Sequence, residues 1–213
     1  MRSQVSGALL AGLIVLITIG VGLGEISTHL TNAADLDAVR DLARERTGAL
    51  TFIAHFLSVL GRTIVIAPLA LVVAVLLGRS GRLVDAVLLI VSAVGALILY
   101  SAIKALVERP RPPIHHLEAA SNWSFPSGHA TTSSAFYLAL ALVLFAEYSV
   151  ARGLAIAAAG LLFAGIGVSR VYLAVHYPAD VVAGMLLGVL WCLFAYRVLQ
   201  RAAQVAGRRR WSR

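Results

Sequence analysis

A histidine and an aspartate lie four residues apart in the stretch from His176 to Asp180. Pro178 between them suits the first turn of a helix, where the missing proline N–H costs nothing, so Asp180 is expected in that first turn. Its carboxylate can then accept a hydrogen bond from one ring nitrogen of His176 and leave the other free to attack. The spacing predicts a nucleophilic histidine. In the alternative interpretation, Asp180 only complements the helix dipole.

A second cluster, Pro126-Ser127-Gly128-His129, precedes a long apolar run. A helix that begins there offers unpaired backbone N–H groups and a positive dipole end, which suit phosphate. Gly128 lets the backbone approach a ligand closely. The alternative is a simple N-cap, with Ser127 or Ser124 as the capping residue. A cap gives no reason for His129.

Three separated cations complete the set. Lys104 and Arg111 belong to the stretch that ends with Pro112, and Arg170 follows Ser169. Taken singly, such cations are interpreted as side chains that snorkel to a membrane interface. Together with two histidines and an aspartate they provide what phosphoryl transfer needs: cations and N–H donors for the oxygens, a nucleophile, and an acid opposite it.

The composition places these residues in a membrane protein. The 213-residue chain has a mean hydropathy of +0.87 and 60% hydrophobic residues, and only 13% of its residues are charged, against about a quarter in soluble domains. The net charge of +8 gathers at the ends of apolar runs, so membrane orientation accounts for it and no nucleic-acid partner is expected. The single cysteine, Cys192, excludes an intramolecular disulfide and a multi-cysteine metal site.

Six apolar runs approach the length of a membrane-spanning helix. They cover residues 6–24, 63–78, 83–103, 129–145, 154–171 and 181–199. The polar segment 25–48 has partly helical spacing of its apolar residues, which predicts an amphipathic surface helix. Residues 51–61 are apolar but too short to span. We therefore predict an all-α fold: one integral membrane domain over residues 1–213, a six-helix bundle with an extracytoplasmic amphipathic helical segment.

The arginines predict the orientation. Six spans place both termini on one side, together with Arg79, Arg82, Arg152 and the arginines of the tail, at 201, 208, 209, 210 and 213. The positive-inside bias makes that side cytoplasmic, although Arg40, Arg44 and Arg46 run against it. All three polar clusters then face the extracytoplasmic side of the plasma membrane.

The three clusters, in this order, resemble the signature of the type 2 phosphatidic acid phosphatase superfamily, the membrane relatives of vanadium haloperoxidases. That signature, K-x6-RP, PSGH and SR-x5-H-x3-D, is matched at Lys104…Arg111-Pro112, Pro126–His129 and Ser169-Arg170…His176…Asp180. The resemblance covers nearly the whole chain, less securely residues 25–61.

The resemblance implies a role for each residue. His176 would attack phosphorus and become phosphohistidine, Asp180 would orient it, and His129 would protonate the leaving oxygen and then activate water. No cofactor or metal is implied. The phosphoryl oxygens would be held by Lys104, Arg111, Arg170, Ser127 and the backbone at Gly128.

The implied substrate is a lipid phosphate or diphosphate within the surrounding membrane lipids, and no obligate protein partner is inferred. Small six-span members suggest a polyprenyl (undecaprenyl-type) diphosphate that is cut to the monophosphate. Phosphatidic acid and phosphatidylglycerophosphate remain alternatives. So do a phosphotransferase with another acceptor and a non-enzymatic lipid-phosphate transporter, although a transporter would usually carry ionisable residues in mid-span.

Two further features are interpreted structurally. Gly184 and Gly188 form a GxxxG pattern in the last apolar run, which we attribute to close packing within the bundle rather than to dimerisation. Arg62 is interpreted as a snorkelling cation, with a phosphate contact as the alternative.

Overall fold

The computed structural model describes residues 2–120, 123–145 and 148–211, and throughout these residues it contains helices and loops but no strand. Arg213 of the predicted basic tail lies outside the described residues, and the side chains of Arg2, Arg208, Arg209 and Arg210 are also not described. The elements are α1 (Arg2–Ile26), the π-helical turn η1 (Ser27–Thr31), α2 (Asn32–Arg44), α3 (Gly48–Leu60), α4 (Thr63–Arg79), α5 (Leu83–Val107), α6 (Gly128–Leu144), α7 (Ser149–Tyr172) and α8 (Pro178–Trp211).

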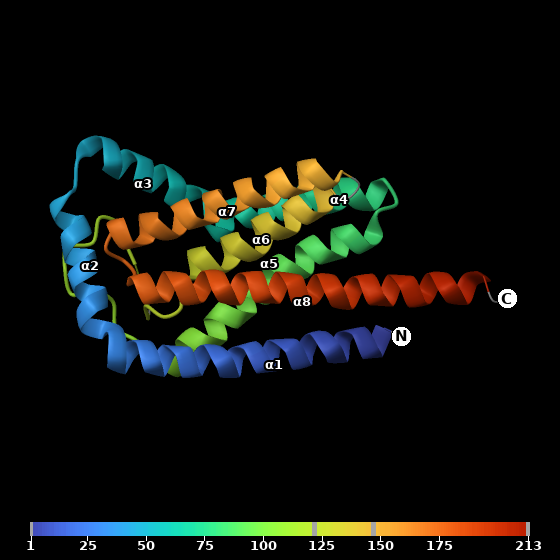
Figure 1. The fold of residues 1–213 in the computed structure, drawn as a ribbon, viewed down its shortest axis with the longest axis horizontal. Helices are drawn as coiled ribbons and strands as arrows, with labels where there is room; N and C mark the ends of the chain where they lie inside the picture. Colours follow the sequence, from blue (N-terminus) through green and yellow to red (C-terminus); the bar gives the residue numbers. More distant parts are fainter. Residues whose placement is uncertain (1, 121–122, 146–147, 212–213) are drawn as a thin grey trace.

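The long helices run side by side, with one end of the bundle distinct from the other (Figure 1). Both termini and the turn between α4 and α5 lie at one end. The loop between α5 and α6, the turn between α7 and α8, and helix α2 lie at the opposite end. A helix occupies each of the six predicted positions, and all three polar clusters fall at the α2 end, which we call the loop end.

The six-span count is not confirmed. By length and composition, four helical stretches of the described chain can cross a membrane: Ser3–Arg44, Leu83–Val107, Ser149–Tyr172 and Pro178–Ala206. The pair α3 and α4, bent by 45° at its junction, gives a fifth if it counts as one span. Helix α6 has only 17 residues and is not among these stretches. It packs against α5, α7 and α8, so protein rather than lipid surrounds most of it.

Helix α6 is the centre of the bundle despite its hydroxyl groups. Thr131 donates to the carbonyl of Ser127 at 2.9 Å, and Thr132 donates to the carbonyl of Gly128 at 2.7 Å. Such bonds to the preceding turn satisfy a buried hydroxyl without a partner from another helix. The polar first half of α6 can therefore lie inside the protein.

Two glycines let α8 approach α6 closely. A Cβ atom at Gly184 would lie 2.8 Å from the carbonyl oxygen of Ser127, and one at Gly188 would lie 2.3 Å from that of Thr131. The GxxxG pattern therefore packs within the bundle, as predicted. At the loop end the backbone N–H of Ser127 donates to the carbonyl of Asp180 at 3.0 Å, so the starts of α6 and α8 are joined.

The segment formed by η1 and α2 covers the loop end. Helix α1 continues through η1 into α2, which crosses the end of the bundle (Figure 1). Val39 of α2 is fully buried in a cluster with Ala130, Val171, Ala174, Tyr177 and Val181. Helix α3 packs along α7. That this segment lies on the membrane surface stays a prediction.

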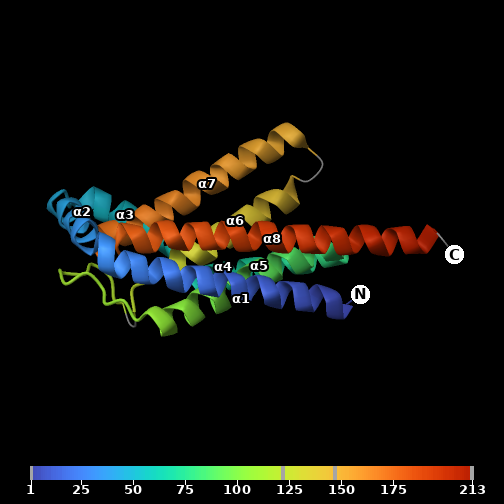
Figure 2. The same ribbon diagram turned by 60° about the horizontal axis from the view of Figure 1, so that its bottom comes forward.

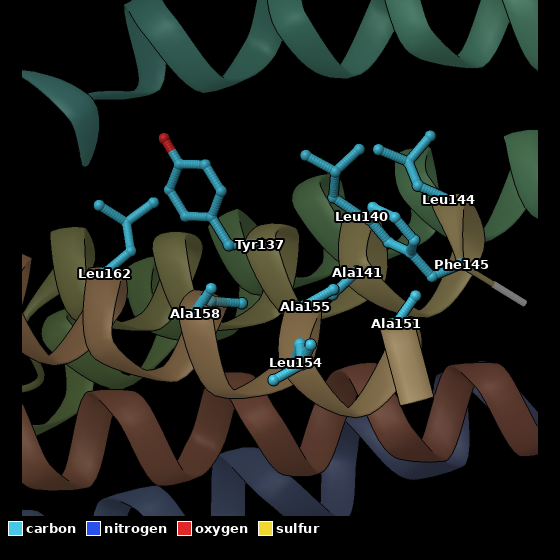
Figure 3. Close-up of a pocket in the computed structure, with 11 residues that line it drawn as sticks. Tyr137, Leu140, Ala141, Leu144, Phe145, Ala151, Leu154, Ala155, Ala158 and Leu162 are labelled. Carbon is cyan, nitrogen blue, oxygen red and sulfur yellow. The ribbon is translucent and has the colours of Figure 1, made fainter. Parts of the chain in front are cut away.

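An apolar cleft of ≈ 530 Å³ lies between α6 and α7, away from the loop end (Figure 3). Figure 2 shows α7 diverging from α6 toward this region. The cleft is lined mainly by alanines and leucines, and the hydroxyl of Tyr137 in its wall donates to the carbonyl of Leu60 at 2.8 Å. This lining offers no group for phosphoryl transfer.

Candidate active site

A polar cavity of ≈ 260 Å³ opens at the loop end. Six of the residues predicted from the sequence line it, and they come from α5, the following loop, α6, α7 and the turn before α8. These residues are Lys104, Arg111, Gly128, His129, Arg170 and His176. The structure thus gathers the two histidines and the three cations around one space.

His176 is held by its Nδ1 atom. This nitrogen lies 3.3 Å from Oδ2 of Asp180. The same oxygen accepts hydrogen bonds from the hydroxyl of Ser124 and, at 2.9 Å, from the backbone N–H of Tyr177. The other ring nitrogen, Nε2, lies 3.4 Å from a guanidinium nitrogen of Arg111, which also lines the cavity.

The electrostatic surroundings keep His176 neutral. Burial, together with the nearby cations Lys104, Arg111 and Arg170, lowers the pKa of His176 well below its ordinary value. The contact with Asp180 is therefore a hydrogen bond from a neutral ring, which places the proton on Nδ1. Nε2 then carries the lone pair of the ring, which faces the guanidinium of Arg111 and can attack an electrophile once that contact is released.

A short turn brings His176 back to the cavity. The N–H of Leu173 donates to the carbonyl of Ser169 at 2.9 Å, and the N–H of Val175 to that of Arg170 at 3.1 Å. Ala174 adopts a left-handed φ of 61°, which reverses the chain within a few residues. Ser169 itself is buried, and its hydroxyl donates to the carbonyl of Ile166 at 2.6 Å, so its side chain serves the helix end.

His129 is the second residue of α6 and lines the same cavity. Its Nε2 atom is buried and has no hydrogen-bond partner in the described part of the chain. A buried ring nitrogen without a partner costs free energy. We therefore expect Nε2 of His129 to exchange a proton with substrate or water, which would be its missing hydrogen-bond partner.

Arg170 is held by an acid that the sequence analysis did not single out. Glu118 accepts at 2.6 Å from Arg170 and, with its other oxygen, at 2.6 Å from Arg62. The hydroxyl of Ser58 donates to Glu118 at 2.9 Å and accepts from Arg170. Burial alone would raise the pKa of Glu118, but Arg170 and Arg62 outweigh it and lower that pKa to about 2. Glu118 is thus a carboxylate, and Arg62 makes a specific ion pair.

The remaining predicted residues divide between lining and support. Lys104 donates to the carbonyls of Trp123 and Ser124, the latter at 3.1 Å. Arg111 donates to the carbonyl of Val175. Ser127 is fully buried, and its hydroxyl accepts from the N–H of Ala130 as the cap of α6, so its hydroxyl does not line the cavity.

Gly128 keeps one wall of the cavity open. A Cβ atom at Gly128 would lie 3.1 Å from the ring of Tyr100, which also lines the cavity. Pro126 precedes this cap, and Pro112 offers its carbonyl to Nε2 of His116 at 2.9 Å. Within the described residues, no three His, Cys, Asp or Glu side chains gather in a way that could hold a metal ion.

Sequence reasoning also missed Arg109 and Asp35. Arg109 has 1% of its surface exposed, and it donates at 2.7 Å to Asp180 and at 2.8 Å to Asp35 of α2. One signal was present: the pair Arg109-Pro110 directly precedes the identical pair Arg111-Pro112. Asp35 gives no local signal, because its charged partner Arg109 comes from a distant part of the chain.

The chain is similar in sequence to two curated proteins. The chain is 35% identical over 96 residues to phosphatidylglycerophosphatase B of Bacillus subtilis, an alignment that covers 44% of this chain and 47% of that protein. It is 45% identical over 78 residues to lipid A 1-phosphatase of Rhizobium johnstonii, which covers 37% of this chain and 29% of the relative. The alignments thus span less than half the length of these two relatives.

The fold is also similar to a crystal structure. A transmembrane PAP2-type phosphatidylglycerolphosphate phosphatase from Bacillus subtilis superimposes with a TM-score of 0.80 at 25% identity, over 89% of this chain and 96% of that one. The model of the PAP2 superfamily matches residues 85–204, which include α6, α7, most of α5 and α8, and every site residue predicted from the sequence. The chain is a multi-pass membrane protein of the PAP2 superfamily.

Proposed function

We propose that the protein hydrolyses lipid phosphates or diphosphates through a phosphohistidine intermediate on His176. The observation that carries this proposal is the set around one cavity: a neutral histidine held by Asp180, a second histidine with an unpartnered nitrogen, and three cations. The two curated relatives are both named as phosphatases of phosphorylated lipids.

In the first half-reaction, Nε2 of His176 attacks phosphorus and the bond to the leaving oxygen breaks. His129, whose protonated form the negative charge of the bound phosphate stabilises, gives its proton to that oxygen. Asp180 stabilises the imidazolium that forms on His176. The three cations and the N–H groups at the start of α6 hold the phosphoryl oxygens as charge shifts between them.

In the second half-reaction, His129 takes a proton from water, and the resulting hydroxide attacks the phosphohistidine. The bond between phosphorus and nitrogen breaks, inorganic phosphate leaves, and His176 returns to its neutral state. Each step needs only groups already placed around the cavity, together with substrate and water.

A neighbouring apolar pocket supports a lipid substrate. A pocket of ≈ 100 Å³ lies between α4 and α5 and shares Thr63 and Thr132 with the polar cavity. Its other lining residues are apolar: Ile66, Ala67, Ala70, Ile90, Ala93, Val94 and Leu97. A substrate with phosphate in the cavity can therefore extend an apolar chain between these helices.

The test is phosphate release by the purified chain in detergent. The panel contains a polyprenyl diphosphate, a polyprenyl monophosphate, phosphatidic acid and phosphatidylglycerophosphate, so that it also ranks the proposed substrates. We expect His176→Ala and His129→Ala each to lower turnover at least 10³-fold. His29→Ala, a change at an exposed residue beside Glu25, is the matched control and should leave turnover unchanged. Turnover at the wild-type level in His176→Ala would overturn the proposal.

Two additions to this assay separate the alternatives. Vanadate should inhibit, since it mimics five-coordinate phosphorus, and a chelator should leave activity intact. Phosphate recovered on another lipid would instead indicate a phosphotransferase, and lipid movement without phosphate release would indicate a transporter.

A further inference from the structure

Arg109 links the catalytic end of α8 to the outer helix α2. Its guanidinium lies between two carboxylates, with one nitrogen 2.7 Å from Oδ1 of Asp180 and another 2.8 Å from Oδ2 of Asp35. It also stacks 4.1 Å from the ring centre of Tyr177. The other oxygen of Asp180 contacts His176. Four side chains therefore form a continuous row, in the order Asp35, Arg109, Asp180 and His176.

Asp35 is itself held in place. Its Oδ1 accepts from the backbone N–H of Ala179 at 3.1 Å, at the start of α8. Its Oδ2 accepts from the hydroxyl of Thr31 at 3.0 Å in addition to Arg109. Only 6% of Asp35 is exposed, whereas Asp37, two residues along the same helix, carries an exposed pair with Arg40.

We propose that Asp35 is a positioning residue for the reaction, which acts through Arg109 to orient Asp180 and to balance the charge that Asp180 presents to His176. The inference rests on the proposed function, since it concerns the same histidine.

The argument is one of charge. Arg109 shares its single positive charge between two carboxylates, so Asp35, Arg109 and Asp180 together carry one negative charge. That charge faces His176 from one side, while Lys104, Arg111 and Arg170 act on the same ring as cations. Without the charge of Asp35, Arg109 would pair with Asp180 alone, and the three groups would be neutral. The imidazolium formed during phosphoryl transfer would then lose stabilisation.

The test compares Asp35→Asn with Asp37→Asn in the full chain in detergent. Asparagine keeps the shape of the side chain and an oxygen for Ala179, and the change removes both the negative charge and the oxygen that accepts from Arg109. For Asp35→Asn we expect kcat to fall roughly tenfold, the size of loss seen when a residue that positions a functional side chain is removed. KM should stay within about twofold of the wild-type value. The inhibition constant of vanadate, which binds as the five-coordinate state does, should rise by the same factor. Asp37→Asn should match the wild type in all three.

Two results would overturn the inference. One is wild-type kcat and vanadate inhibition in Asp35→Asn. The other is a lower kcat with unchanged vanadate inhibition, because that pattern reports only a smaller folded fraction. If Asp35→Asn does not purify as folded protein, Arg109→Lys replaces it, since an ammonium keeps the charge but cannot span both carboxylates. A wild-type chain without phosphatase activity would instead refute the proposed function.

Discussion

Glu118 forms an ion pair with Arg170, one of the cations that the proposed reaction needs to hold phosphate. It accepts from Arg170 at 2.6 Å, yet the Nε of Arg170 is buried without a partner in the described part of the chain, and Arg170 lines the cavity. A phosphoryl group that binds Arg170 must therefore tolerate a carboxylate beside it. Since the pKa of Glu118 is about 2, that carboxylate stays charged at every pH at which the enzyme would work.

Glu118→Gln should therefore strengthen binding of anions. Removing one like charge near the phosphate is worth about 1 kcal/mol in a partly screened site, so inorganic phosphate should inhibit at a several-fold lower concentration. The measurement is the product-inhibition constant of phosphate for the purified variant. Glu45→Gln, at an exposed position just after α2, is the control. An unchanged or higher constant for Glu118→Gln would mean that Glu118 does not compete with phosphate.

Among single residues, the sequence predicts those site residues that stand beside a recognisable helix start or turn. His129 and His176 stand beside a helix start or a helix end, and their positions could be inferred from Gly128 and Pro178. The partners Asp35 and Ser58 could not be inferred, because each reaches the site from an element distant in the sequence. Glu118 could not be inferred because its partner Arg170 is 52 residues away. The hydroxyl of Ser127 caps α6, which was one of the two interpretations of its cluster, and its contact with phosphate remains a prediction.

The packing of α6 against α8 sets the distance between His129, at the start of α6, and His176, just before α8. Both helices begin at the loop end, and the bond from Ser127 to Asp180 joins their first turns. The glycines at 184 and 188 then allow the helices to continue in close contact. A shift of α8 along α6 would move Asp180 relative to His129.

Gly188→Ala should test this contact. The added Cβ would lie 2.1 Å from Oγ of Ser134 and 2.3 Å from a backbone oxygen, so the helices must separate. Overpacking of this kind lowers the free energy of unfolding by roughly 1–3 kcal/mol, which thermal unfolding in detergent would detect, and phosphate release should fall with it. Gly160→Ala meets nothing within 4 Å and should be neutral or slightly stabilising. Equal melting temperatures for the two variants would contradict the close contact.

The helix positions were largely predictable, because apolar runs, capping residues and prolines mark where helices begin and end. The predicted number of membrane spans is not confirmed. Residues 129–145 were expected to span because they are apolar, and α6 has only 17 residues and is covered by other helices. Hydropathy measures transfer from water, and it does not distinguish a lipid-facing helix from one buried in protein.

The polar cavity lies at the loop end, and both termini lie at the opposite end of the molecule (Figure 1). The positive-inside bias predicts that the termini are cytoplasmic and that the cavity opens outward. This arrangement would place the chemistry among the headgroups of the outer leaflet.

Cysteine labelling in intact cells tests this orientation. Cys192 is fully buried and should not react, so single cysteines can be added to the natural chain. Asp41→Cys, on the exposed face of α2, should react with a membrane-impermeant maleimide from outside. Ser80→Cys, in the turn between α4 and α5, should react only after the cells are opened. Labelling of Ser80→Cys in intact cells would reverse the predicted orientation.

The row from Asp35 through Arg109 to Asp180 joins the first helices of the chain to the last one. A chain still emerging from the ribosome reaches the membrane with Asp35 and Arg109 long before it has made His176 and Asp180. Until α8 is made, such a nascent chain possesses neither the proposed nucleophile nor the carboxylate proposed to orient it. The proposed chemistry therefore cannot begin before α8 joins the bundle.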